Sequence, residues 1–254
     1  MRGFAAFTRK ELLEQLRTYK ALILLAVFTL FGMTSPLLAK LMPELLSLMD
    51  MGGVAIQLPQ PTYLDAYTQF FKNVGQMGFI VLLLVLSGTL SQELTKGTLV
   101  NLIAKGLPRG TVLFSKYTAG LLLWTLGYWL AALLSWCYTL YLFPDGAPQR
   151  LGLAFLCMWL FGAFALAVLL LSSALVGGGY GGLLLTAVIL GALLFFNMAP
   201  AIQPYNPASL TVWSNAIVTG DAALWKVYCS MGVTAGGIVL CLLLAVPAFN
   251  RKQL

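Results

Sequence analysis

Few side chains in this sequence of 254 residues are of the types that carry out catalysis or hold metals. There is no histidine, which excludes Ser–His and Cys–His catalysis and haem ligation by histidine. The four cysteines lie inside apolar runs and form no C-x-x-C pair, so we expect buried free thiols and neither a disulfide framework nor a zinc site. They are Cys137, Cys157, Cys229 and Cys241.

Two further absences limit how the chain can use energy. The sequence has no G-x-x-x-x-G-K-[S/T] phosphate loop, so we do not expect this chain to hydrolyse ATP by itself. The centres of its long apolar runs contain no Asp, Glu, Lys or Arg, whereas proton- and sodium-coupled transporters usually keep ionisable groups at membrane depth. If the chain moves a solute uphill, the energy is expected to come from a partner. No catalytic residue, metal site or bound cofactor is predicted.

The polar residues that do gather lie in residues 93–116, ELTKGTLVNLIAKGLPRGTVLFSK, between two long apolar runs. From Thr98 onward the spacing predicts a short amphipathic helix, which Gly106 ends and Pro108 prevents from continuing. This stretch carries four of the fifteen basic residues of the chain: Lys96, Lys105, Arg109 and Lys116.

The two faces of this predicted helix suit two different surroundings. One face is polar and the other aliphatic: Thr98, Asn101 and Lys105 against Leu99, Leu102 and Ile103. The helix can lie on the membrane with its basic residues on anionic lipid. It can equally be a docking helix whose apolar face fits a groove in a soluble partner. The residues alone leave both interpretations open.

The composition then defines the elements that must position this stretch. The chain is 60% hydrophobic and 9% charged, with a mean hydropathy of +0.89. Soluble domains are roughly 45–50% apolar and about 25% charged, so the natural solvent of this chain is lipid. Since a helix needs about 20 apolar residues to cross a bilayer, we predict an all-α membrane protein with six transmembrane helices in a single domain, 1–254. The spans are expected at residues 21–38, 70–90, 117–143, 151–176, 177–198 and 224–249.

The basic residues predict the orientation of these spans. If the N-terminus is cytoplasmic, the inner segments hold five, four and two basic residues, eleven in all, and the outer segments hold four. This asymmetry follows the positive-inside rule and places both termini and residues 93–116 in the cytoplasm. The net charge of +7 is then a matter of orientation, and no nucleic-acid partner is expected.

Residues 1–20 predict an amphipathic helix that lies in the membrane plane before the first span. Its apolar and polar faces are formed by Leu12, Leu16 and Tyr19 and by Lys10, Glu14 and Arg17. A generic membrane anchor without any protein partner is the alternative.

Residues 199–221 form a poor spanning segment because they contain Pro200, Pro204 and Pro207. We expect an extracytoplasmic hairpin, re-entrant or on the surface, with a plain surface loop as the alternative. Trp213 and Trp225 are expected in the interfacial aromatic belt. Two pairs of glycines spaced four apart, Gly178 with Gly182 and Gly232 with Gly236, predict close helix contacts, either internal or at a dimer seam.

Residues 93–116 resemble the first cytoplasmic loop of ABC-2 type transporter permeases. That family shows a Glu, a Gly-Thr pair, an aliphatic helix, a Pro followed closely by Arg, and a Lys that opens the next span. The matching positions are Glu93, Gly97, Thr98, Leu99 to Ile103, Pro108, Arg109 and Lys116. The family often has a small or hydroxyl residue between its Pro and Arg, which this sequence joins directly. The likeness covers residues 4–116, also through RTYK, SPLLAKLMPELL and DAYTQFFKNVGQ.

The resemblance implies a permease subunit in the bacterial cytoplasmic membrane that pairs with a second, identical or homologous subunit. Each subunit would dock on a separate nucleotide-binding ATPase, which holds ATP and Mg²⁺, through a coupling helix in residues 93–110. Residues 1–20 would be an elbow helix that also touches the ATPase. The expected function is ATP-driven export of a hydrophobic or amphipathic substrate, and the chain itself would not be an enzyme.

Two other classes of protein stay open. A membrane-embedded lipid-modifying enzyme needs a cluster of acids or a histidine near one interface. Glu93 stands alone on the inner side of its predicted span, and no second acid joins it. A regulatory membrane subunit that transports nothing is excluded by no feature of the sequence.

Overall fold

The computed structural model describes residues 2–48, 60–95, 108–144, 146, 148–176 and 180–251. These residues form helices and turns, with no β-strand among them, which confirms the all-α prediction. Two short helical elements are a π-helix, η1 (Val74–Gly78), and a 3-10 turn, η2 (Gln203–Tyr205). The α-helices are α1 (Arg2–Arg17), α2 (Lys20–Leu48), α3 (Tyr63–Asn73), α4 (Phe79–Thr95), α6 (Arg109–Leu142), α7 (Leu151–Leu175), α8 (Gly181–Phe196), α9 (Ser209–Thr219) and α10 (Leu224–Asn250).

Among the described residues, five helical segments are long and apolar enough to cross a membrane, which fits a multi-pass membrane protein. They are Lys20–Glu44, Tyr63–Thr89, Arg109–Leu142, Leu151–Leu175 and Leu224–Asn250. The predicted span 177–198 corresponds to α8, which has 16 residues. At about 1.5 Å per residue it is roughly 24 Å long, less than the roughly 30 Å of a hydrocarbon core. The count of six spans is therefore not confirmed.

Helices α3, η1 and α4 follow one another without a break and form one rod. The rod begins at Tyr63, before the predicted span 70–90, because Thr62 and Asp65 form a capping box. The Asp65 carboxylate accepts a hydrogen bond of 2.8 Å from the Thr62 backbone N–H. In η1 the Phe79 N–H donates to the Val74 oxygen, five residues back, so the helix is locally wider. Such π-helical turns are frequent at functional sites.

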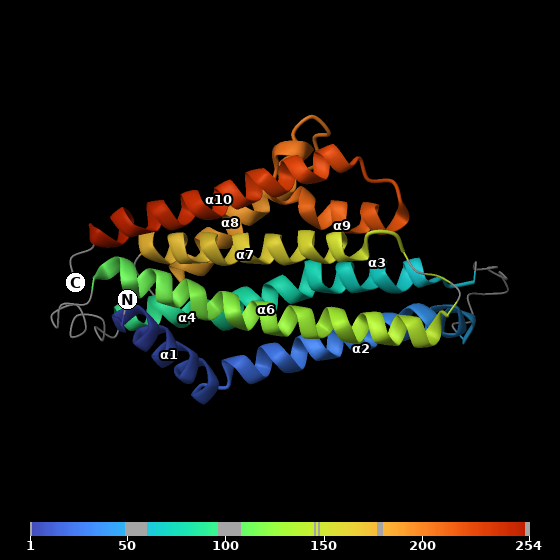
Figure 1. Cartoon of the computed structure of the whole chain (residues 1–254), viewed down its shortest axis with the longest axis horizontal. Helices are drawn as coiled ribbons and strands as arrows, with labels where there is room; N and C mark the ends of the chain where they lie inside the picture. Colours follow the sequence, from blue (N-terminus) through green and yellow to red (C-terminus); the bar gives the residue numbers. More distant parts are fainter. Residues whose placement is uncertain are drawn as a thin grey trace.

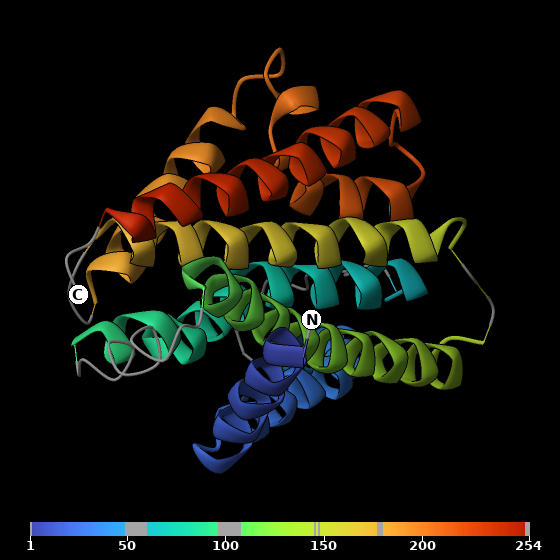
Figure 2. The same cartoon turned by 60° about the vertical axis from the view of Figure 1, so that its left-hand side comes forward.

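Helix α7 runs through the centre of the molecule, with α8, α9 and α10 on one side and α3, α4 and α6 on the other (Figures 1 and 2). A close contact joins it to α6 at Gly162, where a Cβ atom would lie 2.3 Å from the Trp124 ring. The Trp124 indole also donates to the Trp159 backbone oxygen at 2.9 Å. The aromatic core that surrounds this contact includes Phe28, Phe79, Tyr128 and Phe161.

The helix ends gather at two ends of the bundle (Figure 1). What we call the terminus end holds the start of α1, the end of α4, the start of α6 and the end of α10. The opposite end holds the end of α2, the start of α3, the end of α6 and the start of α7. Because α7 finishes near the terminus end, the chain has to run back along the bundle before α10 returns.

This backward run is made by two helices. Helix α8 lies along the half of α7 nearer the terminus end, and α9 lies along the other half (Figures 1 and 2). Between them, over residues 197–208, the chain leaves the α-helical path. Side chains satisfy backbone oxygens around this break: the Asn206 amide donates to the Leu193 oxygen at 2.7 Å, and the Ser230 hydroxyl donates to the Pro204 oxygen at 3.0 Å.

Trp213 of α9 belongs to the same network. Its indole N–H donates to the Ser230 hydroxyl oxygen at 3.3 Å, and the residue is 8% exposed. The predicted interfacial position of Trp213 is therefore wrong, because the ring packs inside the bundle and finds its hydrogen-bond partner on α10. The predicted hairpin 199–221 is seen as a turn followed by a helix that packs on α7.

Candidate functional site

The stretch predicted to couple to a partner begins in α4 and ends at the start of α6. Glu93 lies near the end of α4. Pro108 is the N-cap residue of α6, and Arg109 is its first residue. The structure thus describes the two helices that carry the stretch. The other predicted residues lie outside the described part of the chain, so the coupling helix stays a prediction: Gly97, Thr98, Leu99, Leu102, Ile103 and Lys105.

Arg109 joins the start of α6 to the end of α10. Its guanidinium group donates hydrogen bonds to the backbone oxygens of Phe249 and Asn250, at 3.1 and 2.9 Å. The same group lies 5.8 Å from the centroid of the Phe249 ring. A cation at this position is favourable because the last carbonyls of a helix lack intrahelical donors and carry partial negative charge.

A buried ion pair joins three helices at the terminus end. Lys116 Nζ of α6 lies 2.9 Å from Glu11 Oε2 of α1 and also donates, at 2.9 Å, to the Thr89 backbone oxygen of α4. The Lys116 side chain is 2% exposed and the Glu11 side chain 1%. The second carboxylate oxygen of Glu11 accepts a hydrogen bond of 3.1 Å from Lys10. We call these contacts, together with those of Arg109, the terminus joint.

Helix α1 turns part of its polar surface toward the bundle. Its predicted apolar residues Leu16 and Tyr19 are 58% and 67% exposed. This exposed apolar edge suits a helix that rests on lipid while its opposite side holds the bundle. The side chains that it buries are Phe7, Thr8, Glu11 and Gln15. The predicted polar residues Lys10, Glu14 and Arg17 are exposed, and Lys10 pairs with Glu14 at 2.7 Å.

The sequence pattern did not single out Glu11, and it placed Lys116 at the entrance of a span. One signal was present in residues 1–20. Thr8, Glu11 and Gln15 are spaced i, i+3 and i+7, which puts three polar side chains on one face of a helix. The partner of that face is not readable from spacing, because Lys116 lies 105 residues further along the chain.

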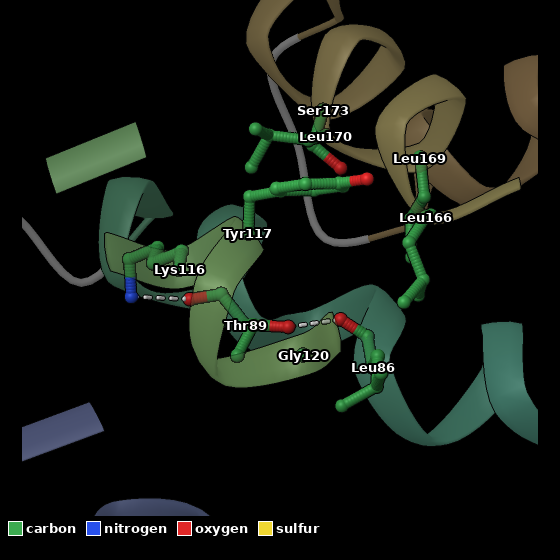
Figure 3. Close-up of a pocket in the computed structure, with 9 residues that line it drawn as sticks. All are labelled: Leu86, Thr89, Lys116, Tyr117, Gly120, Leu166, Leu169, Leu170 and Ser173. Atoms are coloured by element: carbon green, nitrogen blue, oxygen red, sulfur yellow. Dashed lines mark hydrogen bonds between the residues drawn. The ribbon is translucent and has the colours of Figure 1, made fainter. Parts of the chain in front are cut away.

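A cavity of about 30 Å³ lies beside the ion pair, between α4, α6 and α7 (Figure 3). Lys116 and Thr89 line it, and Figure 3 shows the hydrogen bond between them. Tyr117, which also lines it, donates from its hydroxyl to the Ala163 backbone oxygen of α7 at 3.2 Å. The cavity has room for one or two water molecules only. The terminus joint is therefore a packed connection between helices and not a place for an organic ligand.

A much larger hollow of about 850 Å³ lies between α3, η1 and α4 on one side and α8 and α9 on the other. We call it the lateral groove. Its size lies within the roughly 300–1,000 Å³ of small-molecule sites. Its polar residues come from α3, η1 and α9, whereas α4 and α8 contribute apolar side chains such as Phe79, Leu83, Leu190 and Leu194. The groove is thus polar toward the opposite end and apolar toward the terminus end.

Two polar groups of the lateral groove lack partners. Lys72 is exposed and forms no hydrogen bond or ion pair with any residue that the structure describes. The Oδ1 atom of Asn215 is buried and accepts no hydrogen bond from the described residues. The groove therefore offers one cation next to an apolar channel, whereas the Asn215 oxygen has no surface accessible from the groove.

Within the described part of the chain, no three His, Cys, Asp or Glu side chains gather in a way that could hold a metal ion. No family model and no curated protein matches this chain. The fold and the site together define a coarse class: a helical multi-pass membrane protein with a polar joint at one end and an open groove along its side.

Proposed function

We propose that this chain is the permease subunit of an ATP-driven transporter of the ABC-2 type, and that a separate ATPase docks on residues 93–110. The observation that carries the proposal is the terminus joint. Helices α4 and α6, which flank the docking stretch, are bonded to each other through Lys116 and the Thr89 oxygen. Through Glu11 and Arg109 the same joint also holds α1 and α10.

A movement of the docked ATPase would act on α4 and α6 together. Lys116 would pass this movement to α1, Arg109 would pass it to α10, and Tyr117 would pass it to α7. Close-packed interiors have low compressibility, so the joined helices move as a unit. The lateral groove lies between the α3–η1–α4 rod and the helices α8 and α9. A tilt of that rod changes the width of the groove.

The substrate class in this proposal is hydrophobic or amphipathic, and the direction is export. The mainly apolar lining of the lateral groove supports this class. The bacterial cytoplasmic membrane, the cytoplasmic termini and a second permease subunit belong to the same proposal. They rest on the resemblance of residues 4–116 and on the distribution of eleven inner against four outer basic residues. ATP and Mg²⁺ would be held by the partner ATPase.

The test is the docking face of the predicted coupling helix. Burying an aliphatic side chain in an interface is worth roughly 1.5–3 kcal/mol, and an Asp there adds a desolvation cost. We therefore expect Leu102→Asp and Ile103→Asp to insert normally into the membrane and to weaken ATPase recruitment by about tenfold or more, since about 1.4 kcal/mol already gives a factor of ten. Pull-down of the ATPase on solubilised variants measures this, with ATP turnover as the second readout.

The matched control is Lys105→Ala on the polar face of the same helix. It should change recruitment little, because exposed charges contribute about 0–1 kcal/mol. Undiminished recruitment and turnover with both Asp variants would return the helix to the role of a lipid anchor and remove the main support for the proposal.

A further inference from the structure

We propose that the lateral groove binds an anionic, lipid-like amphipath, with its head group at Lys72 and its chain along α4 and α8. Transport of this ligand rests on the proposed function. Its binding is a property of this chain alone and is tested without any ATPase.

The charge of the ligand follows from Lys72. This residue lies on α3, two to three helical turns from the opposite end, and lines a groove whose walls are mainly apolar. A cation beside apolar surface in a membrane is costly unless an opposite charge or water accompanies it. Among the residues that the structure describes, no carboxylate lines the groove, so an anionic head group is the complement that these residues lack.

Polar side chains near Lys72 suit the head group of such a ligand. Thr68 and Gln76 of the rod and Thr211 and Asn215 of α9 line the groove together with Lys72. A hydroxyl or N–H group in the ligand head, as in a glycerol or amide head group, can hydrogen-bond to side chains of these types.

The length of the apolar part fits one leaflet of a bilayer. From Lys72 to Leu83 the rod advances by 11 residues, which is about 16 Å at about 1.5 Å per residue. Half of a roughly 30 Å hydrocarbon core is about the same. A ligand with its head at Lys72 would therefore place its chain along Phe79, Leu83 and Leu190, toward the middle of the membrane, in the orientation of a lipid in that leaflet.

The binding experiment uses the purified chain in a neutral detergent and two lysophospholipids with the same oleoyl chain. Lysophosphatidylglycerol is anionic, and lysophosphatidylcholine is zwitterionic. Native mass spectrometry gives the affinity of each. We expect the anionic probe to bind about tenfold more tightly. Lys72→Gln should remove most of this preference and leave the affinity for the zwitterionic probe unchanged. Lys226→Gln, which changes a basic residue of α10 outside the groove, should keep the full preference.

A second pair of variants tests the place of the acyl chain. Gly191 lines the groove, and a Cβ atom there would meet nothing within 4 Å. Gly191→Leu should therefore fill the groove without disturbing the packing, and both probes should bind about tenfold more weakly. Gly236 on α10 is equally open and does not line the groove, so Gly236→Leu should leave both affinities unchanged.

Three outcomes would overturn the inference. Equal affinity for the two probes, or an unchanged preference in Lys72→Gln, would mean that Lys72 only reaches toward the membrane surface, as long basic side chains do. Binding that ignores Gly191→Leu would place the ligand elsewhere. Binding only after dissociation of a dimer would show that a second copy covers the groove. If the chain fails these binding tests but still recruits the ATPase, only this inference is wrong. If the chain binds the anionic probe as expected but does not recruit the ATPase, only the proposed function is wrong.

Discussion

Two lysines show how differently the two halves of this molecule treat a positive charge. Lys116, at the terminus joint, is 4% exposed and bonded to a carboxylate and a backbone oxygen. Lys72, at the lateral groove, is exposed and has no partner among the described residues. The Lys116 ammonium group has its hydrogen-bond partners inside the protein. The Lys72 ammonium group is available to a ligand.

The space beside the two lysines differs in size. The cavity beside Lys116 has about 30 Å³, and the groove beside Lys72 about 850 Å³. A charge that is buried and bonded on all sides resists movement of the helices that share it. A charged side chain at the rim of an open groove can bind a new partner without breaking contacts inside the protein. We therefore expect stability to depend on the joint and ligand binding to depend on the groove.

The largest expected effect is on the buried pair. Glu11→Leu or Lys116→Met leaves the other charge buried without its partner, which should cost about 3–5 kcal/mol of unfolding free energy. The double variant Glu11→Leu/Lys116→Met replaces both charges by apolar groups and should recover most of this loss. Denaturant unfolding of the purified protein in detergent measures all three.

The matched control is Lys72→Met, which should change the unfolding free energy by no more than about 0.5 kcal/mol. Two single losses that simply add in the double variant would mean that Glu11 and Lys116 are energetically independent. In that case the comparison between joint and groove fails.

A smaller effect separates two glycines of α8. A Cβ atom at Gly182 would lie 2.5 Å from Ser173 Oγ and 2.8 Å from Ser173 Cα, so Gly182→Ala should cost about 1–3 kcal/mol by overpacking. At Gly191 a Cβ atom would meet nothing within 4 Å. Gly191→Ala should be neutral or stabilising, because Ala favours helix over Gly by about 1 kcal/mol. Thermal unfolding compares the two, and equal losses would show that α8 is as tightly packed at the groove as it is against Ser173 of α7.

The smallest expected effect is at Arg109. Arg109→Gln removes the cation from the last carbonyls of α10, which should cost about 0.3–1 kcal/mol. Because the effect is local, hydrogen exchange of the last turn of α10 should become faster while the middle of that helix stays protected. Arg9→Gln, at an exposed position of α1, is the control and should leave this exchange unchanged. Unchanged exchange in Arg109→Gln would mean that other contacts hold the end of α10.

The positions of most helices could be predicted from the sequence. A long apolar run in lipid has to form a helix, because its backbone N–H and C=O groups find no water to bind. The predicted span 151–176 corresponds closely to α7, and the predicted span 117–143 matches the end of α6, which begins eight residues earlier at Arg109. The close contact predicted from small-residue spacing occurs at Gly182, against Ser173, and Gly178 lies outside the described residues. It does not occur inside this chain at Gly232 and Gly236, where a Cβ atom would meet nothing within 4 Å. These features depend on neighbours in sequence or on composition, which a single chain shows directly.

The terminus joint and the α8–α9 break were not readable, because both depend on distant partners. Glu11 and Lys116 are 105 residues apart, and neither position is unusual by itself. Residues 209–219 follow three prolines and were expected in a hairpin, re-entrant or on the surface. They form a helix that packs on α7, and the Ser209 hydroxyl at its start donates to the Ser230 hydroxyl of α10 at 3.0 Å. The coupling stretch lies largely outside the described residues, so its prediction stands as it was made.

The break between α8 and α9 also sets an order of events during biosynthesis. The hydroxyl that donates to the Pro204 oxygen belongs to Ser230 in α10, which is synthesised after the break. Until α10 arrives, that oxygen lacks its Ser230 donor, and a buried carbonyl without a donor costs about 1–3 kcal/mol. We therefore expect α8, α9 and α10 to be inserted and packed as one unit. A chain that stops before residue 224 would hold an unfinished segment in the bilayer and become a substrate for membrane quality-control proteases.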